Sequence, residues 1–360
     1  MPPLRGITWD HPRGYDPLVA TARAYAASHP GVEIVWDRRS LQAFGDAALA
    51  QLAETYDLLV IDHPHVGEVA RQGILVPLNS GPPTAGRSQE SYEYDARVWA
   101  LAIDASAQVS AYGPGRISRP PESWEEVTEL ARSGRVVWPL KPVDALMSFF
   151  TLAANRGTPC GARPGEFLDP GDAEAVLEGM ARISRHLPAA CLRMDPIEAL
   201  DLLSGEDSFA YVPLLFAYSN YARDGFRRHR LGFAGIPGVR GSVLGGTGLA
   251  VSARSVSTAA AVDYAVAVAG EEYQKGIYWE SGGQPAHAAA WDDERANAVT
   301  HGFFRSVRRT LDESWLRPRH AGYLRFQDAG GALINAFLRG EASTSETVRR
   351  LESSYAASMP

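Results

Sequence analysis

The chain has 360 residues, more than one hydrophobic core usually supports, so we expect two compact units. Hydrophobic residues make up 45% and charged residues 21%, the balance of an ordinary globular protein. A net charge of −7 and the absence of a long basic run argue against nucleic acid or an anionic membrane surface as a partner. No window reaches the ~18 apolar residues of a membrane helix, so we expect no membrane insertion.

The N-terminal residues carry no apolar leader segment with a small-residue cleavage site, and no lipid-attachment cysteine. Residues 1–6 run directly into a strand-like segment. As written, the sequence therefore predicts a cytoplasmic protein. It predicts a periplasmic or extracellular one if a leader has been removed.

The first third of the chain alternates strand and helix patterns, which is typical of an open parallel sheet with right-handed crossovers. Apolar periodicity predicts, in chain order, a strand over 4–10, a helix over 16–28, a strand over 32–36, a helix over 44–52, a strand over 57–62 and a helix over 66–72. The strand 57–62 is almost wholly apolar, which indicates burial on both faces of the sheet. Gly73 is expected to end the helix that follows.

The middle third contains two segments that we interpret as crossings between lobes. Strand-like runs over 97–103 and 107–112 flank Asp104-Ala105-Ser106, and Gly245-Gly246-Thr247-Gly248 precedes an apolar strand over 249–251. Between them the pattern predicts a capping box at 123–126, a strand over 136–138, a helix over 144–155, a helix over 172–185 and a strand over 209–212 that ends at Pro213.

The last third is helical, with predicted helices over 258–269 and 271–280 and several more between 291 and 357, the first opened by Trp291. The predicted fold class is therefore α/β with two lobes. We place lobe 1 at 1–105 plus 247–300 and lobe 2 at 106–246 plus 301–360, with a hinge near 104–108 and 243–248.

Several short motifs follow one another in an order that matches a known family. They are Trp9-Asp10-His11, Asp62-His63-Pro64-His65, Asp104-Ala105-Ser106-Ala107-Gln108-Val109, Pro120-Pro121-Glu122-Ser123-Trp124-Glu125-Glu126, Gly245-Gly246-Thr247-Gly248-Leu249-Ala250-Val251-Ser252 and Ser281-Gly282-Gly283-Gln284-Pro285. In their order and spacing, over nearly the whole length, the chain resembles the family 1 extracellular solute-binding proteins of bacterial ABC transporters, the group that contains maltose-binding proteins. The resemblance implies a periplasmic-binding-protein-like type II fold with an interlobe ligand cleft and closure on binding. The chain departs from that family in lacking an export signal.

Polar and aromatic side chains gather where the first and third predicted strands end. Ligands of open α/β sheets bind outside the carboxyl ends of strands, and these two ends should share one edge. The candidate ligand contacts there are Trp9, Asp10, His11, Arg13, Tyr15, Asp62, His63 and His65. Trp9 and Tyr15 offer flat faces for a sugar or aromatic ring, and Arg13 can hold a carboxylate or phosphate. Trp9 as a core residue and Asp10 as a helix cap are the alternatives.

The three histidines of this set leave further alternatives open. With Asp10 and Asp62 they could form a mixed imidazole and carboxylate metal site, or they could act in acid–base chemistry. In the second case the catalytic residues would be Asp10, Asp62 and His63. Loop histidines that only make hydrogen bonds are the third alternative. Nothing in the sequence demands a metal or an organic cofactor, so neither is predicted.

The other candidate ligand contacts lie along the rest of the chain. They are Asp104 at the first crossing, Lys141 before a predicted helix start, Tyr211 and Tyr218 near a strand end, Gly246 and Thr247 at the return crossing, and, by the resemblance, Gln284. A helix start beside Lys141 would favour an anionic group. Tyr218 and Tyr221 would share a face if their segment is helical. The glycines before the return strand lack a Gly-Lys-Ser/Thr ending, so we expect close backbone approach there, not a phosphate loop.

The two cysteines leave their state open. Cys160 and Cys191 could form one disulfide or remain two buried thiols. Thiaminase I has the same general fold and uses a cleft cysteine, but Cys160 has no acid or base near it in sequence. Hydrolase and dinucleotide-binding motifs are absent.

We therefore expect a solute-binding protein that closes around a small polar ligand, either a sugar or polyol or an organic acid. The alternative is a cytoplasmic enzyme on the same fold, using the cleft Asp and His residues on a small molecule. A third hypothesis is an intracellular sensor in which ligand-driven closure is transmitted to a protein partner. We expect a monomer whose partner is its ligand, with an ABC-transporter permease as a second partner if the protein is exported.

Overall fold

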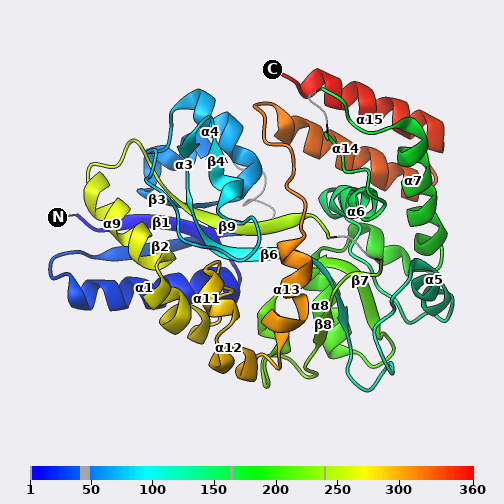
Figure 1. Ribbon diagram of the computed structural model, residues 1–360, viewed down its shortest axis with the longest axis horizontal. Coiled ribbons are helices and arrows are strands. Elements are labelled where there is room, and N and C mark those ends of the chain that lie inside the picture. Colours follow the sequence, from blue (N-terminus) through cyan, green and yellow to red (C-terminus); the bar gives the residue numbers. More distant parts are fainter. Residues whose placement is uncertain (1, 41–48, 163–164, 239–240) are drawn as a thin grey trace. The chain divides into compact units, whose positions relative to one another are not determined.

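The computed structural model describes residues 2–40, 49–162, 165–238 and 241–360, and the chain divides into two compact units (Figure 1). Unit 1 consists of Met1–Ser106, Tyr218–Asn220 and Gly245–Phe304, and unit 2 of Ala107–Ala217, Tyr221–Leu244 and Arg305–Pro360. The short segment Tyr218-Ser219-Asn220 was expected in lobe 2. The structure places it in unit 1, because its polar groups hydrogen-bond to the segment around Gln284.

The sheet of unit 1 begins with three parallel strands, as the sequence predicts. They are β1 (Leu4–Trp9), β2 (Ile34–Arg39) and β3 (Leu58–Ile61), with β1 in the middle. The strand β9 (Leu244–Val251) runs antiparallel to β3, and β6 (Leu101–Tyr112) comes next in the order β2-β1-β3-β9-β6. All four residues of β3 are buried, which confirms the interpretation of its apolar sequence.

Helices cover both faces of this sheet: in Figure 1, α3 and α4 lie above it and α1 lies below. The helices of unit 1 are α1 (Pro12–Ser28), α3 (Leu49–Thr55), α4 (Val66–Gln72), α9 (Thr258–Ala269), α10 (Glu271–Tyr273) leading into a π-helical turn (Gln274–Tyr278), α11 (Ala288–Trp291) and α12 (Glu294–Val299). Gly73 ends α4 with a left-handed φ of 63°, as predicted. The first part of the predicted helix 44–52 lies outside the described residues.

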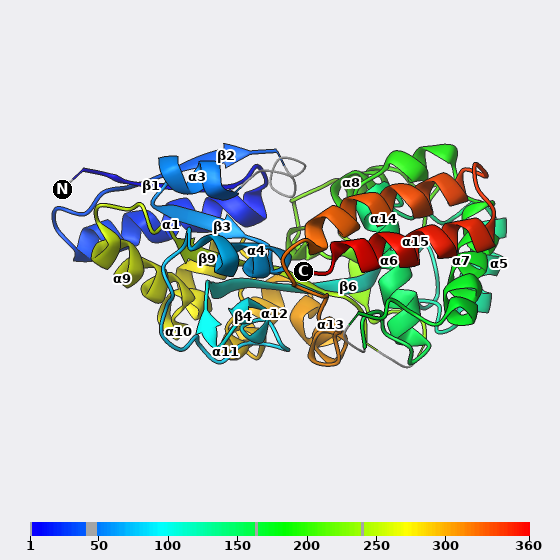
Figure 2. The ribbon, with the colours of Figure 1, turned by 90° about the horizontal axis from the view of Figure 1, so that it is seen from above.

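Unit 2 is mainly helical, and Figure 2 shows α14 and α15 side by side along it. Its helices are α5 (Trp124–Arg132), α6 (Pro142–Asn155), α7 (Pro170–Ser184), α8 (Pro196–Gly205), α14 (Tyr323–Leu338) and α15 (Thr344–Ser358), and α13 (Phe303–Asp312) leads into it. The strands β7 (Tyr211–Phe216) and β8 (Gly232–Ala234) pair with the second half of β6. A core rich in aromatic rings, including Phe149, Phe150 and Phe326, joins α6 to α14.

Two predicted interruptions turn out to be continuous strands. The structure has one strand, β6, where two runs around Asp104–Ser106 were predicted, because the Asp104 carboxylate is neutralised inside unit 1 by Arg13. The glycines 245–248 lie within β9, not in a loop before it. Gly246 allows β9 to pass close to the backbone of Asp104.

Three smaller predictions were wrong. Residues 136–138 form no strand, since only Val136 makes a bridge, to Tyr211. The strand that was expected to end at Pro213 continues to Phe216, and Pro213 is tolerated because the pairing with β6 shifts register there. Trp291 ends α11 and does not open a helix, because the His287 side chain caps α11 by accepting from the Ala289 N–H.

Among the residues that the structure describes, no helix combines the length and the apolar character needed to cross a membrane.

Candidate functional site

The carboxyl end of β1 divides its candidate residues between core and surface. Trp9 is 3% exposed and belongs to the core of unit 1, where a Cβ on Gly14 would lie only 2.4 Å from its ring. Trp9 is therefore a core residue, which was the alternative interpretation, and its ring does not offer an open face on which a ligand could stack. Asp10 is exposed and pairs with Arg38 at 3.1 Å, and the Arg38 guanidinium covers the half-buried Tyr15 ring at 4.7 Å.

The carboxyl end of β3 is tightly organised. Asp62 caps a short 3₁₀ helix (His63–His65) by accepting from the His63 N–H at 2.8 Å, and its carboxylate also lies 3.1 Å from His63 Nδ1. His63 is fully buried and meets the Tyr92 ring edge-on, and His65 is 5% exposed. His63 therefore has a structural environment inside unit 1, while Asp10 has its own partner on the surface.

Arg13 and Asp104 form a buried ion pair inside unit 1. Arg13 Nε donates to Asp104 Oδ2 at 2.8 Å and Nη2 donates to Oδ1 at 2.5 Å. Burial raises the pKa of the Asp104 carboxyl, and the charge and hydrogen bonds of Arg13 offset part of that rise. The Arg13 fork was expected to hold a ligand carboxylate, but the structure commits it to an internal carboxylate because Asp104 lies directly in front of it.

The segment Tyr218-Ser219-Asn220 packs over this pair. The Tyr218 ring lies 4.6 Å from the Arg13 guanidinium and 4.6 Å from the His11 ring centroid. The Ser219 N–H donates to Gln284 Oε1 at 2.9 Å, and Asn220 Nδ2 donates to the Gly282 carbonyl at 3.0 Å. Residues from distant parts of the sequence therefore meet in one place within unit 1.

Gln284 connects this segment to β6, because its Nε2 donates to the Ala105 carbonyl at 2.8 Å. Gly246 of β9 lies against the same stretch: its φ is 102°, and a Cβ there would lie 2.3 Å from the Asp104 carbonyl oxygen. We call this set the crossing cluster, and it consists of Arg13, Asp104, Ser106, Ser219, Asn220, Thr247 and Gln284. All seven side chains are at most 7% exposed.

Four polar atoms of the crossing cluster have no hydrogen-bond partner among the described residues: Ser106 Oγ, Ser219 Oγ, Asn220 Oδ1 and Thr247 Oγ1. Buried hydroxyl and amide groups are costly when unsatisfied, and folded proteins rarely keep several in one place. Three hydroxyls and one amide oxygen are groups that complement the hydroxyls of a small polar ligand. Of the four, only Thr247 was a candidate ligand contact from the sequence. Ser106 entered only as part of the motif at the first crossing and Asn220 only as a neighbour of Tyr218 and Tyr221, and nothing pointed to Ser219.

Unit 2 has its own buried polar group at the start of α6. Lys141 lies 3.5 Å from Asp195, so this cation too is paired with an internal carboxylate. Asp144, in the first turn of α6, is 5% exposed, and burial, followed by the charge of Asp195, raises its carboxyl pKa well above the ordinary value. The helix start beside Lys141 is as predicted, and Asp144 is the acidic residue in its first turn.

The tyrosines that were expected to lie together near a strand end and contact the ligand do not come together. Tyr211 starts β7 at its amino end and is fully buried in the core, so the strand-end prediction for it was wrong. Tyr218 belongs to unit 1 and Tyr221 to unit 2. The Tyr221 hydroxyl donates to Asp201 at 2.6 Å, beneath the Arg227 guanidinium.

The open questions about metal and thiol chemistry have structural answers. Within the described ranges, no group of three or more His, Cys, Asp or Glu side chains is arranged to hold a metal ion. Cys160 and Cys191 are buried free thiols, so they form no disulfide. Burial raises the pKa of both thiols, which keeps them protonated and poorly nucleophilic.

No family model matches the sequence, and no curated protein matches it. Solved structures match over almost the whole chain. They include maltose-bound MalE3 of T. maritima (16% identity, 98% of each chain covered, TM-score 0.84) and the GacH receptor of Streptomyces glaucescens, solved unliganded and with acarbose (14% identity, 99% of this chain and 98% of that one covered, TM-score 0.82). A third is an ABC-transporter solute-binding protein of Agrobacterium radiobacter in complex with ribitol (16% identity, 99% and 98% covered, TM-score 0.81). The chain thus has the α/β fold of these two-lobed solute-binding proteins, as the motif order predicted.

Proposed function

We propose that this protein is a solute-binding protein for a neutral sugar or polyol, and that the crossing cluster supplies the ligand contacts of unit 1. The observation that carries this is the set of four buried polar atoms without a partner among the described residues, at Ser106, Ser219, Asn220 and Thr247. A polyhydroxylated ligand would satisfy these atoms by donating and accepting hydrogen bonds, which removes their desolvation cost.

The charges near these atoms favour a neutral ligand over an organic acid. Arg13 is neutralised by Asp104, and Lys141 by Asp195. A carboxylate ligand would have to displace one of these internal carboxylates or bind close to it, and like charges repel. The two cations that made an organic acid plausible from the sequence are therefore already engaged.

For unit 2 we propose Asp144 as the ligand contact. Its buried carboxylate destabilises the fold when ionised, as the raised pKa indicates. Such groups cluster at functional sites, where a ligand can stabilise what the fold alone does not. A carboxylate accepts hydrogen bonds from adjacent sugar hydroxyls, which would offset its desolvation.

Closure of the two units around the ligand is the movement we propose for binding. The chain crosses between units within β6 at Ser106, on either side of Tyr218–Asn220, at the start of β9 and near Phe304, and a few such residues can absorb a hinge rotation. The similar structures support the ligand class, since they hold maltose, acarbose and ribitol as bound molecules.

The test is a thermal-shift screen of neutral sugars and polyols, repeated on Thr247→Val and Ser106→Ala. Each substitution removes one unpartnered hydroxyl, so the free protein should melt at the same or a slightly higher temperature. Affinity for the best ligand should fall about 3- to 10-fold per hydroxyl, the value of one neutral hydrogen bond.

Ser345→Ala is the matched control, because that exposed hydroxyl already bonds to Glu174 in unit 2. It should leave affinity unchanged. If the panel produces no ligand, or if the two buried substitutions leave affinity intact, the crossing cluster is not a polyol site.

A further inference from the structure

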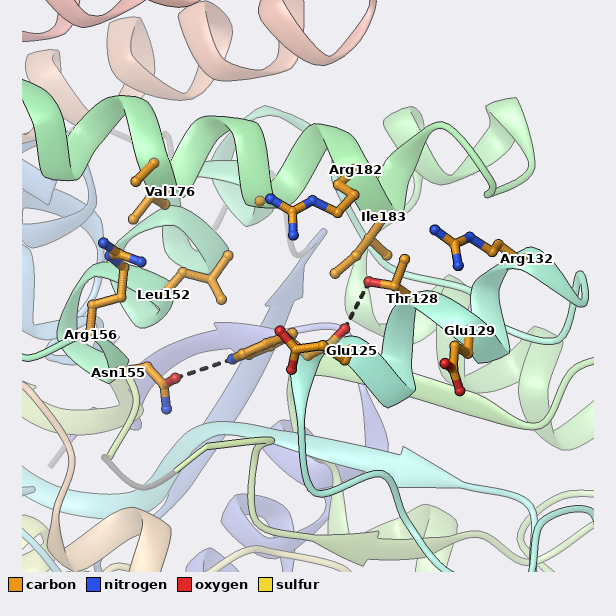
Figure 3. A pocket seen from close by; sticks show the side chains of 13 residues that line it. Glu125, Thr128, Glu129, Arg132, Leu152, Asn155, Arg156, Val176, Arg182 and Ile183 are labelled. Atoms are coloured by element: carbon orange, nitrogen blue, oxygen red, sulfur yellow. Dashed lines mark hydrogen bonds between the residues drawn. The ribbon is translucent and has the colours of Figure 1, made fainter.

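A cavity of about 360 Å³ lies within unit 2, between α5 and α7 with the end of α6 at one side (Figure 3). None of its lining residues belongs to the crossing cluster. Its volume is in the range of small-molecule binding pockets. We call it the α5–α7 cavity.

The cavity exists because α7 presents small residues toward α5. Ala175 and Gly179 lie one turn apart on the lining face of α7. A Cβ built on Gly179 would meet no atom within 4 Å, so neither packing nor backbone conformation requires glycine there. Glycine within a helix lowers its stability, so this position leaves space at a cost to the fold.

The floor of the cavity is apolar and fixed. The Trp124 indole donates to Asn155 Oδ1 at 3.1 Å, and Asn155 in turn donates to the Pro237 carbonyl at 3.2 Å, which holds the ring in place. Leu152, Val176 and Ile183 complete the apolar surface, as Figure 3 shows. A ligand that binds on this floor needs an apolar body, because the amide group of Asn155 is already hydrogen-bonded to the Trp124 indole and the Pro237 carbonyl.

Three arginines line the cavity: Arg132 of α5, Arg156 directly after α6, and Arg182 of α7. Arg156 lies 3.7 Å from Asp172. Arg132 and Arg182 have no ion pair among the described residues of the chain. Arg119 of the same unit, by contrast, is paired with Glu126 at 2.9 Å. Two guanidinium forks beside an apolar floor are therefore available to an anionic group.

Two carboxylates, Glu125 and Glu129, also line the cavity, so its lining carries three positive and two negative charges. We propose that the α5–α7 cavity is a second ligand site, which binds a small amphipathic anion: an apolar, ring-sized body on the Trp124 floor and a carboxylate or sulfonate on Arg182 and Arg132. This second site is distinct from the proposed polyol site, because its ligand is an amphipathic anion instead of a neutral polyol and its lining residues are different.

The probe is 1-anilinonaphthalene-8-sulfonate, an aromatic anion whose fluorescence rises in an apolar pocket. The folded protein should bind it saturably. Arg182→Gln should weaken binding about 10-fold, since a charge-assisted hydrogen bond is lost. Glu125→Gln should leave binding equal or tighter, because a repelling charge is removed. Gly179→Leu fills the space and should abolish binding while the far-ultraviolet circular dichroism and melting transition stay intact.

Arg185→Gln, directly after the same helix but outside the cavity, is the matched control and should leave binding unchanged. Thr247→Val should also leave it unchanged, which separates this site from the crossing cluster. Equal binding by wild type and Gly179→Leu, or stronger loss with Glu125→Gln than with Arg182→Gln, would overturn the proposal.

Discussion

The guanidinium of Arg13 and the carboxylate of Asp104 face each other in a two-bonded ion pair that is almost fully buried, with side chains 5% and 0% exposed. Removal of one partner leaves the other charge buried and uncompensated. We therefore expect Asp104→Asn to lower the free energy of unfolding by about 3–5 kcal/mol, measured by urea denaturation.

The control for this prediction is Asp10→Asn, which breaks the exposed pair with Arg38 and should cost less than about 1 kcal/mol. The double variant Arg13→Met, Asp104→Leu replaces the pair with apolar side chains. It should recover most of the lost stability. If Asp104→Asn is as mild as Asp10→Asn, the pair is not the buried contact described above.

Asp144 predicts a stability that depends on pH. Its folded-state pKa lies well above the ordinary carboxyl value because of burial. Between the unfolded and folded pKa values the unfolded chain binds fewer protons, so this group lowers stability as pH rises through that window. Asp144→Asn should therefore raise the urea midpoint at pH 7, and the gain should shrink as pH falls toward 4. A variant that is less stable at pH 7 would show that the ionised carboxylate is satisfied within the fold.

Gly246 is required by both its conformation and its neighbour. Its φ of 102° is unfavourable for other residues, and a Cβ would lie 2.3 Å from the Asp104 carbonyl oxygen. Gly246→Ala should lower the free energy of unfolding by about 3 kcal/mol or more. Gly157→Ala is the matched control, because its φ is 87° but nothing lies within 4 Å of its Cβ, and it should cost about 1–2 kcal/mol. Equal costs would mean that the close approach to β6 contributes nothing.

At Gly179, replacement by alanine should change the free energy of unfolding in the opposite direction. Because its Cβ would meet open space within α7, Gly179→Ala should raise the free energy of unfolding by about 0.5–1 kcal/mol. Gly331 in α14 provides the contrast, since a Cβ there would lie 2.5 Å from the Pro142 carbonyl oxygen. Gly331→Ala should cost about 1–3 kcal/mol. Chemical denaturation of both variants checks the pair, and a destabilised Gly179→Ala would contradict the open cavity.

The sequence predicted the fold well because the fold depends on local patterns. The apolar run 57–62, the glycine stop at Gly73 and the helix 258–269 each follow from periodicity or backbone preference, and the structure has each of them. Where the predictions failed, a tertiary contact decided the outcome. From the sequence, the charged Asp104 predicts a break in a strand. In the structure it lies within β6, because Arg13, far away in sequence, neutralises its carboxylate.

The candidate site was less predictable for the same reason. Ser219 and Asn220 join unit 1 through hydrogen bonds to Gln284 and Gly282, and no pattern around residue 219 signals that. Trp9 at a strand end was equally compatible with core and surface, and only the packing against Gly14 distinguishes the two. Reasoning from a single sequence identifies where strands end. It does not show which side chains at those ends point into the core.

Binding of a neutral polyol rather than an acid is tested most directly by isothermal titration calorimetry with matched pairs, sorbitol against gluconate and ribitol against ribonate. Each pair shares its carbon skeleton and differs in one carboxylate. We predict saturable binding of a neutral member, at least 10-fold tighter than its acid, and weaker binding in Thr247→Val. Tighter binding of the acids would contradict the assignment, because it would mean that Arg13 or Lys141 receives a ligand carboxylate in place of its internal partner.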